Sequence, residues 1–194
     1  EFVNNKVCFV RCDLNLPIVD NKITDFTRLD EIIPTLEKLI SRNGKIILIS
    51  HLGRPKGKVD ENLSLEMMIP HIEERLKRSV FFCKEQILSS ETEEKIKKLP
   101  PKGVLLLENI RFYKQEEEND KKFSSKISEY GDIYINESFS TSHRNHASIT
   151  GISSFLPSFP GKLFEQEIKN LNVITRGLNQ SRSVAILGGA KIST

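Results

Sequence analysis

The sequence has few cysteines, no tryptophan and no long apolar run. Its three cysteines, Cys8, Cys12 and Cys83, are an odd number without C-x-x-C spacing. This excludes a disulfide framework or a paired-cysteine zinc site as the expected architecture and favours a reducing compartment, so we predict a cytoplasmic protein. The longest apolar runs, such as Ile46–Ile49, have the length of a buried strand and are far too short to span a membrane. No signal-peptide pattern is visible, although the chain begins at Glu1 rather than at methionine, which leaves open whether a leader was removed.

The sequence also has only a small excess of positive over negative charge. The 194 residues carry a net charge of only +3, which by itself gives no reason to expect a nucleic-acid or membrane partner. With 38% hydrophobic and 28% charged residues, the composition is that of a soluble globular protein. A monomer is also expected, although the composition does not bear on it.

Short, continuously apolar segments alternate with amphipathic ones along the chain. Strands are expected at Val7–Arg11, Lys45–Ser50, Val80–Phe82, Val104–Leu107, Ile133–Asn136 and Ser183–Leu187. Helices are expected at Leu29–Arg42, Leu65–Arg78, Glu91–Leu99, Lys121–Tyr130 and Phe164–Arg176. This alternation predicts an α/β fold, with an open, mostly parallel sheet covered by helices on both faces. In such folds ligands bind beyond the carboxyl ends of the strands.

Polar and mostly cationic side chains follow four of these strands. They are Asp13 and Asn15; His51 and Arg54; Glu108, Asn109 and Arg111; and Glu137, His143, Arg144 and His146, with Arg28 at the entrance of the first helix. Arginine offers a planar fork that matches phosphate or carboxylate oxygens, and histidine adds a shorter donor. An acceptor beside such a group suits a hydroxyl. The pattern therefore predicts a pocket for a small, doubly anionic, hydroxylated ligand.

Each of these residues also has a simpler interpretation. An arginine in a loop is usually a solvated charge, and Asp13 and Asn15 are also typical turn residues. His71 lies inside a predicted helix and is interpreted as structural, and the mixed charges of Glu116–Lys122 are interpreted as a solvated face. The cysteines are interpreted as small core residues. Only the coincidence of so many groups at the same sheet edge favours a binding site.

Six motifs carry a specific resemblance. They are VRCDLNLP (Val10–Pro17), ITDFTR (Ile23–Arg28), SHLGRPKGK (Ser50–Lys58), LLLENIRFY (Leu105–Tyr113), SHRNHAS (Ser142–Ser148) and AILGGAKIS (Ala185–Ser193). They resemble the successive signatures of phosphoglycerate kinases, in that family's order, and the resemblance covers essentially the whole chain. That family has two similar lobes joined by a helix, and the resemblance implies the Rossmann-like, three-layer N-terminal lobe.

The resemblance implies roles for residues at the phosphate end of the site. His51, Arg54, Arg111 and Arg144 would hold the non-transferred phosphate of 3-phosphoglycerate or 1,3-bisphosphoglycerate. The backbone at Leu14, Leu52 and Gly53 would line the site.

At the reacting end, the resemblance implies that Asp13 and Asn15 contact the glycerate hydroxyl and that Arg28 contacts the carboxyl group or acyl phosphate. Lys191, with Gly189 and Ala190, would reach the phosphates of ATP or ADP, which the family binds with Mg²⁺. Arg28 and Lys191 are thus the expected catalytic residues of the glycolytic transfer between 1,3-bisphosphoglycerate and ADP. No metal ligand is expected in this chain.

The resemblance also predicts a domain organisation. Residues 1–162 would form the phosphoglycerate-binding domain, residues 163–182 the interdomain helix and linker, and residues 183–194 the first strand of a nucleotide-binding domain. The family's chain is about twice as long, so we expect this chain to bind 3-phosphoglycerate but to transfer no phosphoryl group alone.

The sequence departs from the family pattern at Glu137-Ser138-Phe139-Ser140, where members commonly carry Asp-Ala-Phe-Gly. We expect this to alter the loop that leads to Arg144. Two other functions share some of the features: a non-catalytic module that binds a phosphorylated acid, and an RNA-binding surface. The AILGGAKIS segment argues against the first. The second would require exposed aromatic residues interleaved with the basic ones, and only Phe112 and Tyr113 adjoin a predicted site arginine.

Overall fold

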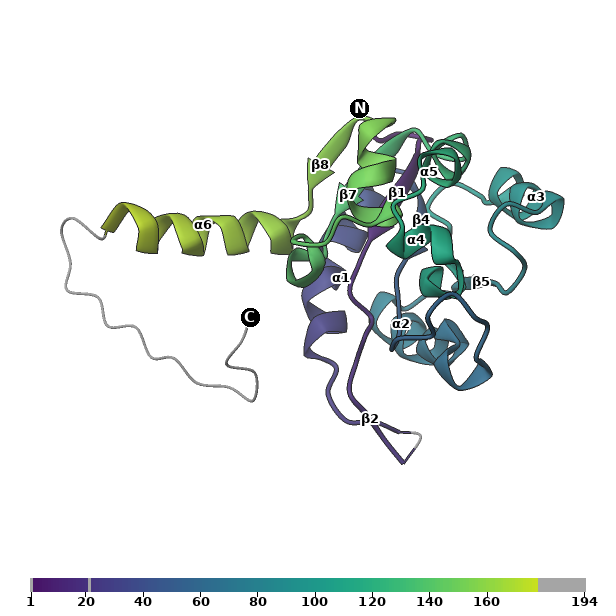
Figure 1. Cartoon of the computed structure of the whole chain (residues 1–194). Coiled ribbons are helices and arrows are strands. Elements are labelled where there is room, and N and C mark those ends of the chain that lie inside the picture. The colour runs from purple at the N-terminus through teal and green to yellow at the C-terminus, as the bar shows by residue number, and fades with distance from the viewer. Residues whose placement is uncertain (1, 21, 178–194) are drawn as a thin grey trace.

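The computed structural model describes residues 2–20 and 22–177, and its centre is a six-stranded parallel sheet (Figure 1). The strands are β1 (Val7–Arg11), β4 (Lys45–Ile49), β5 (Phe81–Cys83), β6 (Val104–Leu107), β7 (Ile133–Asn136) and β8 (Ser158–Pro160). They lie in the order β5-β6-β4-β1-β7-β8, and every neighbouring pair is parallel. The predicted α/β fold is confirmed.

Helices cover both faces of the sheet. They are α1 (Thr27–Ser41), α2 (Ile69–Leu76), α3 (Ser90–Lys98), α4 (Lys114–Glu117), α5 (Lys121–Ser128) and α6 (Lys162–Gly177). Alternate residues of a strand point to opposite faces, and the core divides accordingly: Val10 packs in a cluster with residues of α1 and α2, and Phe9 packs in a second cluster with residues of α3 and α5. Cys8, Cys12 and Cys83 are buried in these clusters, which confirms their interpretation as core residues.

Most predicted elements are present, with boundaries that shift by a few residues. The helix predicted from Leu65 begins instead with a 3₁₀ turn at Leu65–Met68, and Ser64 caps that turn rather than α2. Strand β5 begins one residue later than predicted, at Phe81. The sequence analysis missed β8 and the small antiparallel pair β2 (Ile18–Val19) and β3 (Lys22–Ile23). The predicted strand Ser183–Leu187 lies outside the described residues.

Helix α6 begins at Lys162, two residues before the predicted start, and extends away from the sheet (Figure 1). Its first turn is anchored to the body. Thr35 in α1 accepts a hydrogen bond from the Lys162 amide, and the buried Glu137 carboxylate accepts bonds from the amides of Leu163 and Phe164. Acceptors at this position satisfy amides that a helix leaves unpaired at its N-terminus.

Candidate anion-binding site

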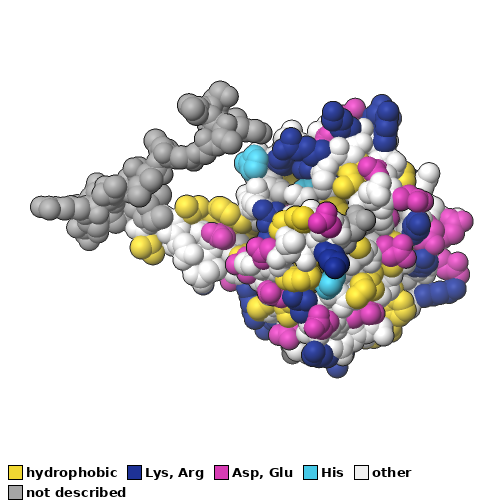
Figure 2. Space-filling model, turned by 90° about the horizontal axis from the view of Figure 1, so that it is seen from below, with side chains coloured by type: hydrophobic (Ala, Val, Ile, Leu, Met, Phe, Trp, Pro, Cys, Tyr) yellow, Lys and Arg dark blue, Asp and Glu magenta, His cyan; other side chains and the backbone are white. Residues whose placement is uncertain are grey.

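Loops after β1, β4, β6 and β7 meet at the carboxyl edge of the sheet. The β2–β3 pair, which follows β1, lies at the bottom of Figure 1, and Figure 2 views the molecule from that side. On this face Lys and Arg side chains gather beside a histidine over one region, while acidic side chains are spread over much of the rest (Figure 2). The predicted convergence of loops at one edge therefore occurs in the structure.

The loop after β1 places a buried carboxylate beside an exposed arginine. Asp13 Oδ2 accepts a hydrogen bond from Arg28 Nη1 at 3.0 Å, and the same nitrogen donates to the Asn15 carbonyl oxygen at 3.0 Å. The Asp13 carboxylate is only 9% exposed, whereas the Arg28 side chain is 48% exposed. Arg28 is therefore held at the second residue of α1 while its other nitrogens remain accessible to a ligand.

The loop after β4 joins this group to Arg111. The Gly53 amide donates to Asn15 Oδ1 at 2.8 Å, and the Gly53 carbonyl accepts from Arg111 Nη1 at 2.9 Å. Gly53 has a φ of +61°, and a Cβ there would lie 2.7 Å from a methyl carbon of Leu63. Both the left-handed backbone and the close contact require glycine. Asn109 fixes the loop further by donating to the carbonyls of Leu52 and Leu63.

His51, Arg111 and Arg144 form what we call the cationic cluster. His51 and Arg111 are each 3% exposed. Burial, followed by the charges of Arg11, Arg111 and Arg144, lowers the pKa of His51 to about 2, so its ring is neutral. Burial and the charge of Arg144 also lower the pKa of Arg111. The three side chains are thus close enough to influence one another strongly.

Arg111 has buried donors that are suited to an anion. Its Nε and Nη2 are buried and have no hydrogen-bond partner. Glu117 Oε1 lies 3.8 Å from Nε, which is too long for a hydrogen bond. Each buried donor without a partner costs about 1–3 kcal/mol. An oxyanion between Arg111 and Arg144 would supply the missing acceptors.

The other predicted site residues lie either on the exposed surface of these loops or in the core beneath them. Arg54 is exposed on the same loop as Gly53, and His143 is exposed beside Arg144; neither side chain makes a hydrogen bond or ion pair with another described residue. Leu14 and Leu52 are buried in the core, and the Leu14 amide already donates to Ser50 Oγ. His71 lies in α2 with its ring against Phe26, consistent with a structural role.

Sequence reasoning missed three buried polar residues behind the cationic cluster: Arg11, Glu116 and Ser148, all with no exposed surface. Glu116 was interpreted as part of a solvated face, and this is wrong: its carboxylate accepts from both the amide and the hydroxyl of Ser148. The signal that could have revealed the group is Arg11 itself. An arginine that ends a strand buried on both faces requires a partner.

The departure at residues 137–140 has direct structural consequences. Ser140 Oγ donates to Asp13 Oδ2 at 2.5 Å, a bond that the glycine common in the family would lack. Glu137 reaches the N-terminus of α6, and a Cβ added at Gly161 would lie 2.1 Å from its carboxyl carbon. The loop over residues 137–140 is therefore hydrogen-bonded to Asp13 on one side and to α6 on the other.

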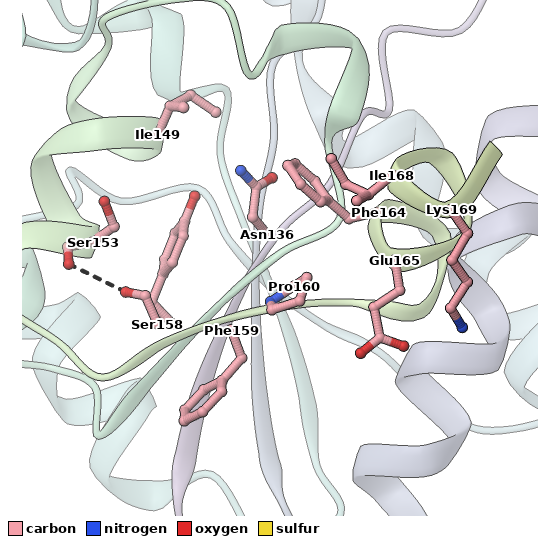
Figure 3. Close-up of a pocket in the computed structure, with 11 residues that line it drawn as sticks. Asn136, Ile149, Ser153, Ser158, Phe159, Pro160, Phe164, Glu165, Ile168 and Lys169 are labelled. Carbon is pink, nitrogen blue, oxygen red and sulfur yellow. Dashed lines mark hydrogen bonds between the residues drawn. The ribbon is translucent and has the colours of Figure 1, made fainter. Parts of the chain in front are cut away.

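Hollows adjoin the site and α6, and two of them bear on what the site could bind. A cavity of about 160 Å³ adjoins Asp13, Arg28 and Ser140 and is also lined by Glu31, Glu137 and Glu167. A second hollow, of about 530 Å³, lies between β8 and α6 (Figure 3). Its lining includes Phe159, Phe164 and Ile168, and Lys169 is the only cationic residue among the described residues that line it. The volume of the second hollow is larger, but its chemistry does not suit a phosphorylated acid.

The nucleotide-binding residues predicted at Gly189, Ala190 and Lys191 lie outside the described residues. Within residues 2–20 and 22–177, no three His, Cys, Asp or Glu side chains are grouped so as to hold a metal ion. No helix in that part of the chain is long and apolar enough to cross a bilayer.

Fold and geometry together define an α/β protein with a candidate anion-binding site at the carboxyl edge of a parallel sheet. The family model described as phosphoglycerate kinase matches residues 2–194. The chain belongs to the phosphoglycerate kinase family.

Individual relatives agree with this assignment. A phosphoglycerate kinase of Orientia tsutsugamushi (strain Ikeda) is 46% identical over 192 residues, which cover 99% of this chain and 47% of the relative. One from Finegoldia magna is 42% identical, covering 98% and 48%. The solved phosphoglycerate kinase of Pyrococcus horikoshii OT3 superposes with a TM-score of 0.82 at 30% identity, covering 94% of this chain and 45% of that one. That of Coxiella burnetii gives 0.80 at 28% identity, covering 93% and 44%. The chain thus spans about half the length of the curated relatives it matches.

Proposed function

We propose that this chain is the phosphoglycerate-binding half of a glycolytic phosphoglycerate kinase, which transfers a phosphoryl group between 1,3-bisphosphoglycerate and ADP. The observation that carries the proposal is the pair of buried, unpaired N–H groups on Arg111 beside Arg144 and His51. Arginine pairs with phosphate through charge-assisted hydrogen bonds that a neutral ligand cannot match.

In the proposal, the ligand is oriented because the two ends of the site carry different groups: the cationic cluster at one end, and Asp13 with Arg28 at the other. Its 3-phosphate lies against the cationic cluster, with Arg54 closing over it from the exposed loop. The glycerate hydroxyl donates to Asp13, whose neighbour Asn15 shapes the same wall. The carboxyl group, or acyl phosphate, lies at Arg28, whose guanidinium is already steered by Asp13 and the Asn15 carbonyl.

Phosphoryl transfer needs positioning and neutralisation of charge more than covalent chemistry. In the proposal, Arg28 faces the migrating group from this half, and Lys191, with Gly189 and Ala190, faces it from the nucleotide-binding half. The proposed domains are residues 1–162, the helical connection 163–182, and the start of the second domain at 183–194. Mg²⁺ would be held mainly with ATP or ADP by that second domain, so this chain alone is proposed to be inactive.

The setting of the protein forms part of the same proposal: a monomer in the cytoplasm, with no nucleic-acid or membrane partner. Three buried cysteines without a disulfide support a reducing compartment. A non-catalytic module that binds a phosphorylated acid would use the same pocket. The family model favours the kinase, because its match continues through residues 185–194 to the end of the chain.

Isothermal titration with 3-phosphoglycerate tests the binding half of the proposal. Arg111→Ala removes the two unpaired donors, and we expect it to weaken binding by at least about tenfold, because each charge-assisted hydrogen bond contributes roughly 1.5–3 kcal/mol. Arg42→Ala, at an exposed position beyond the end of α1, is the matched control and should leave binding unchanged. Equal affinities for the Arg111→Ala variant and the unmodified chain would refute the site.

A further inference from the structure

Behind the cationic cluster lies a continuous row of buried polar side chains that the proposed substrate would not touch. It consists of Arg11 at the end of β1, Ser148 in a π-helical turn (Ala147–Gly151), and Glu116 in α4. All three have no exposed surface. Buried charged groups are costly unless they are paired and hydrogen-bonded, so a row of this kind calls for an explanation.

Hydrogen bonds connect these residues in series, from Glu116 through Ser148 and Arg11 to His51. The Glu116 carboxylate accepts from the Ser148 hydroxyl at 2.6 Å and from the Ser148 amide at 2.8 Å. Ser148 Oγ accepts from Arg11 Nε at 2.9 Å, and Arg11 Nη1 donates to the Cys12 carbonyl. Arg11 Nη2 lies 3.2 Å from His51 Nδ1. The guanidinium is therefore held by all three of its nitrogens.

This arrangement determines which nitrogen of His51 carries the proton. A guanidinium donates hydrogen bonds and cannot accept them. His51 Nδ1 must therefore accept from Arg11, which places the ring proton on Nε2 and makes Nε2–H a donor. Four titratable or charged groups influence the ring: Arg11, Arg111, Arg144 and His146. None of them is a carboxylate, so a second proton on His51 would add positive charge to a site that already holds three guanidinium groups.

We propose that Arg11 is a positioning residue, held in place by Ser148 and Glu116, which locks His51 as a neutral Nε2–H donor for the phosphate of the ligand. The inference rests on the proposed function for the identity of that ligand. It implies that His51 donates one fixed hydrogen bond and never competes with the ligand for a proton. The low pKa of His51, near 2, agrees with the geometry.

The test is a two-bond ¹H–¹⁵N spectrum of the His51 ring in the ¹⁵N-labelled chain, recorded without ligand between pH 5 and 8. The expected spectrum shows the Nε2–H tautomer, with Nδ1 unprotonated and no change across the range. A spectrum showing Nδ1–H, a tautomer mixture, or an imidazolium at pH 5 to 6 would overturn the inference, whether or not 3-phosphoglycerate binds. Conversely, a locked tautomer with no 3-phosphoglycerate binding would refute the proposed function alone.

Substitutions distinguish a role of Arg11 in positioning His51 from a purely structural role. In Arg11→Met the donor to Nδ1 and one charge are lost, so we expect mixed tautomers and a His51 pKa that rises towards its ordinary value near 6.5. We then compare how the affinity for 3-phosphoglycerate changes between pH 8 and pH 5 in the two proteins. Relative to the unmodified chain, the affinity of Arg11→Met should increase roughly tenfold as the pH falls, which corresponds to a shift of one unit in the pKa of His51 on binding. The unmodified chain supplies the baseline for protonation of the phosphate itself.

Two further variants complete the design. Arg42→Met removes an exposed arginine and should leave the His51 spectrum unchanged. Ser148→Ala cuts the link to Glu116 while retaining Arg11, and we expect it to fold even if Arg11→Met does not. It should broaden or mix the His51 tautomer signals. An unaltered, fully locked tautomer in both Ser148→Ala and a folded Arg11→Met would show that the row of buried residues plays no part in positioning.

Discussion

At the scale of single residues, Arg111 gives the main support for the proposed binding site. A guanidinium that is 3% exposed, with two unpaired nitrogens, destabilises the fold unless a ligand compensates for it. The Gly53 carbonyl satisfies only part of its donor capacity, and Glu117 Oε1, at 3.8 Å from Nε, is too far away to accept a hydrogen bond. The side chain thus combines a structural contact, through Nη1, with donors held ready for an anion.

Glu137 provides a prediction at the same scale. Burial raises the pKa of its carboxyl group, although hydrogen bonds from Thr35 and from the amides of Lys162, Leu163 and Phe164 oppose the shift. Because the folded-state pKa is raised, the folded protein binds the proton more tightly, and stability falls as the pH rises from the unfolded pKa through the folded one. Glu137→Gln cannot ionise, so this fall should be missing from its unfolding free energy.

Urea denaturation between pH 4 and 8 measures that difference. The stability of Glu137→Gln relative to the unmodified chain should improve as the pH rises. Glu165→Gln, at an exposed position one turn into α6, controls for the loss of a charge. If the stability of Glu137→Gln relative to the unmodified chain did not change with pH, or decreased as the pH rises, the raised pKa of Glu137 would be contradicted.

The sequence predicts the positions of polar residues that follow strands better than those of polar residues that are buried by tertiary contacts. Asp13, His51 and Arg111 directly follow recognisable strands, so their convergence follows from parallel-sheet topology. Glu116 could not be placed in the same way, because a carboxylate in a charged run is normally solvated and only tertiary contact with Ser148 buries it. The hydrogen bond from Ser140 to Asp13 joins residues 127 positions apart and likewise has no local signature.

At the scale of elements, the central strands are the most predictable because they are buried on both faces. Strands β1, β6 and β7 match their predicted bounds, since each is a short apolar run closed by polar residues. Strand β8 could not be found this way: Ser158–Pro160 is exposed, contains a proline and becomes a strand only by pairing with β7. The π-helical turn that carries Ser148 depends on long-range packing rather than on local sequence.

The cap of α5 provides an element-scale prediction. Asp120 is the N-cap residue of α5, and its Oδ1 accepts a hydrogen bond from the Phe123 amide at 2.7 Å. Asp120→Ala should lower the unfolding free energy by about 1 kcal/mol. Asp120→Asn keeps an acceptor and should lose only the interaction of its charge with the helix dipole, about 0.3–1 kcal/mol. Chemical denaturation measures both, and a larger loss for Asn than for Ala would contradict the cap.

At the scale of the whole molecule, six parallel strands bring four loops to one edge, and a network of loop hydrogen bonds joins three of them. The network runs from Arg28 through Asn15 and Gly53 to Arg111. It links residues from three of the loops or their neighbouring helix without any ligand. The site is thus largely preorganised within this half of the family's length, which is why we expect it to bind 3-phosphoglycerate alone.

A crystal structure of the chain soaked with 3-phosphoglycerate tests the central claim most directly. The account predicts the phosphate between Arg111 and Arg144, with His51 Nε2 donating to it and the ligand hydroxyl at Asp13. Density for the ligand in the hollow between β8 and α6, or a phosphate bound away from the Arg111 nitrogens, would contradict it.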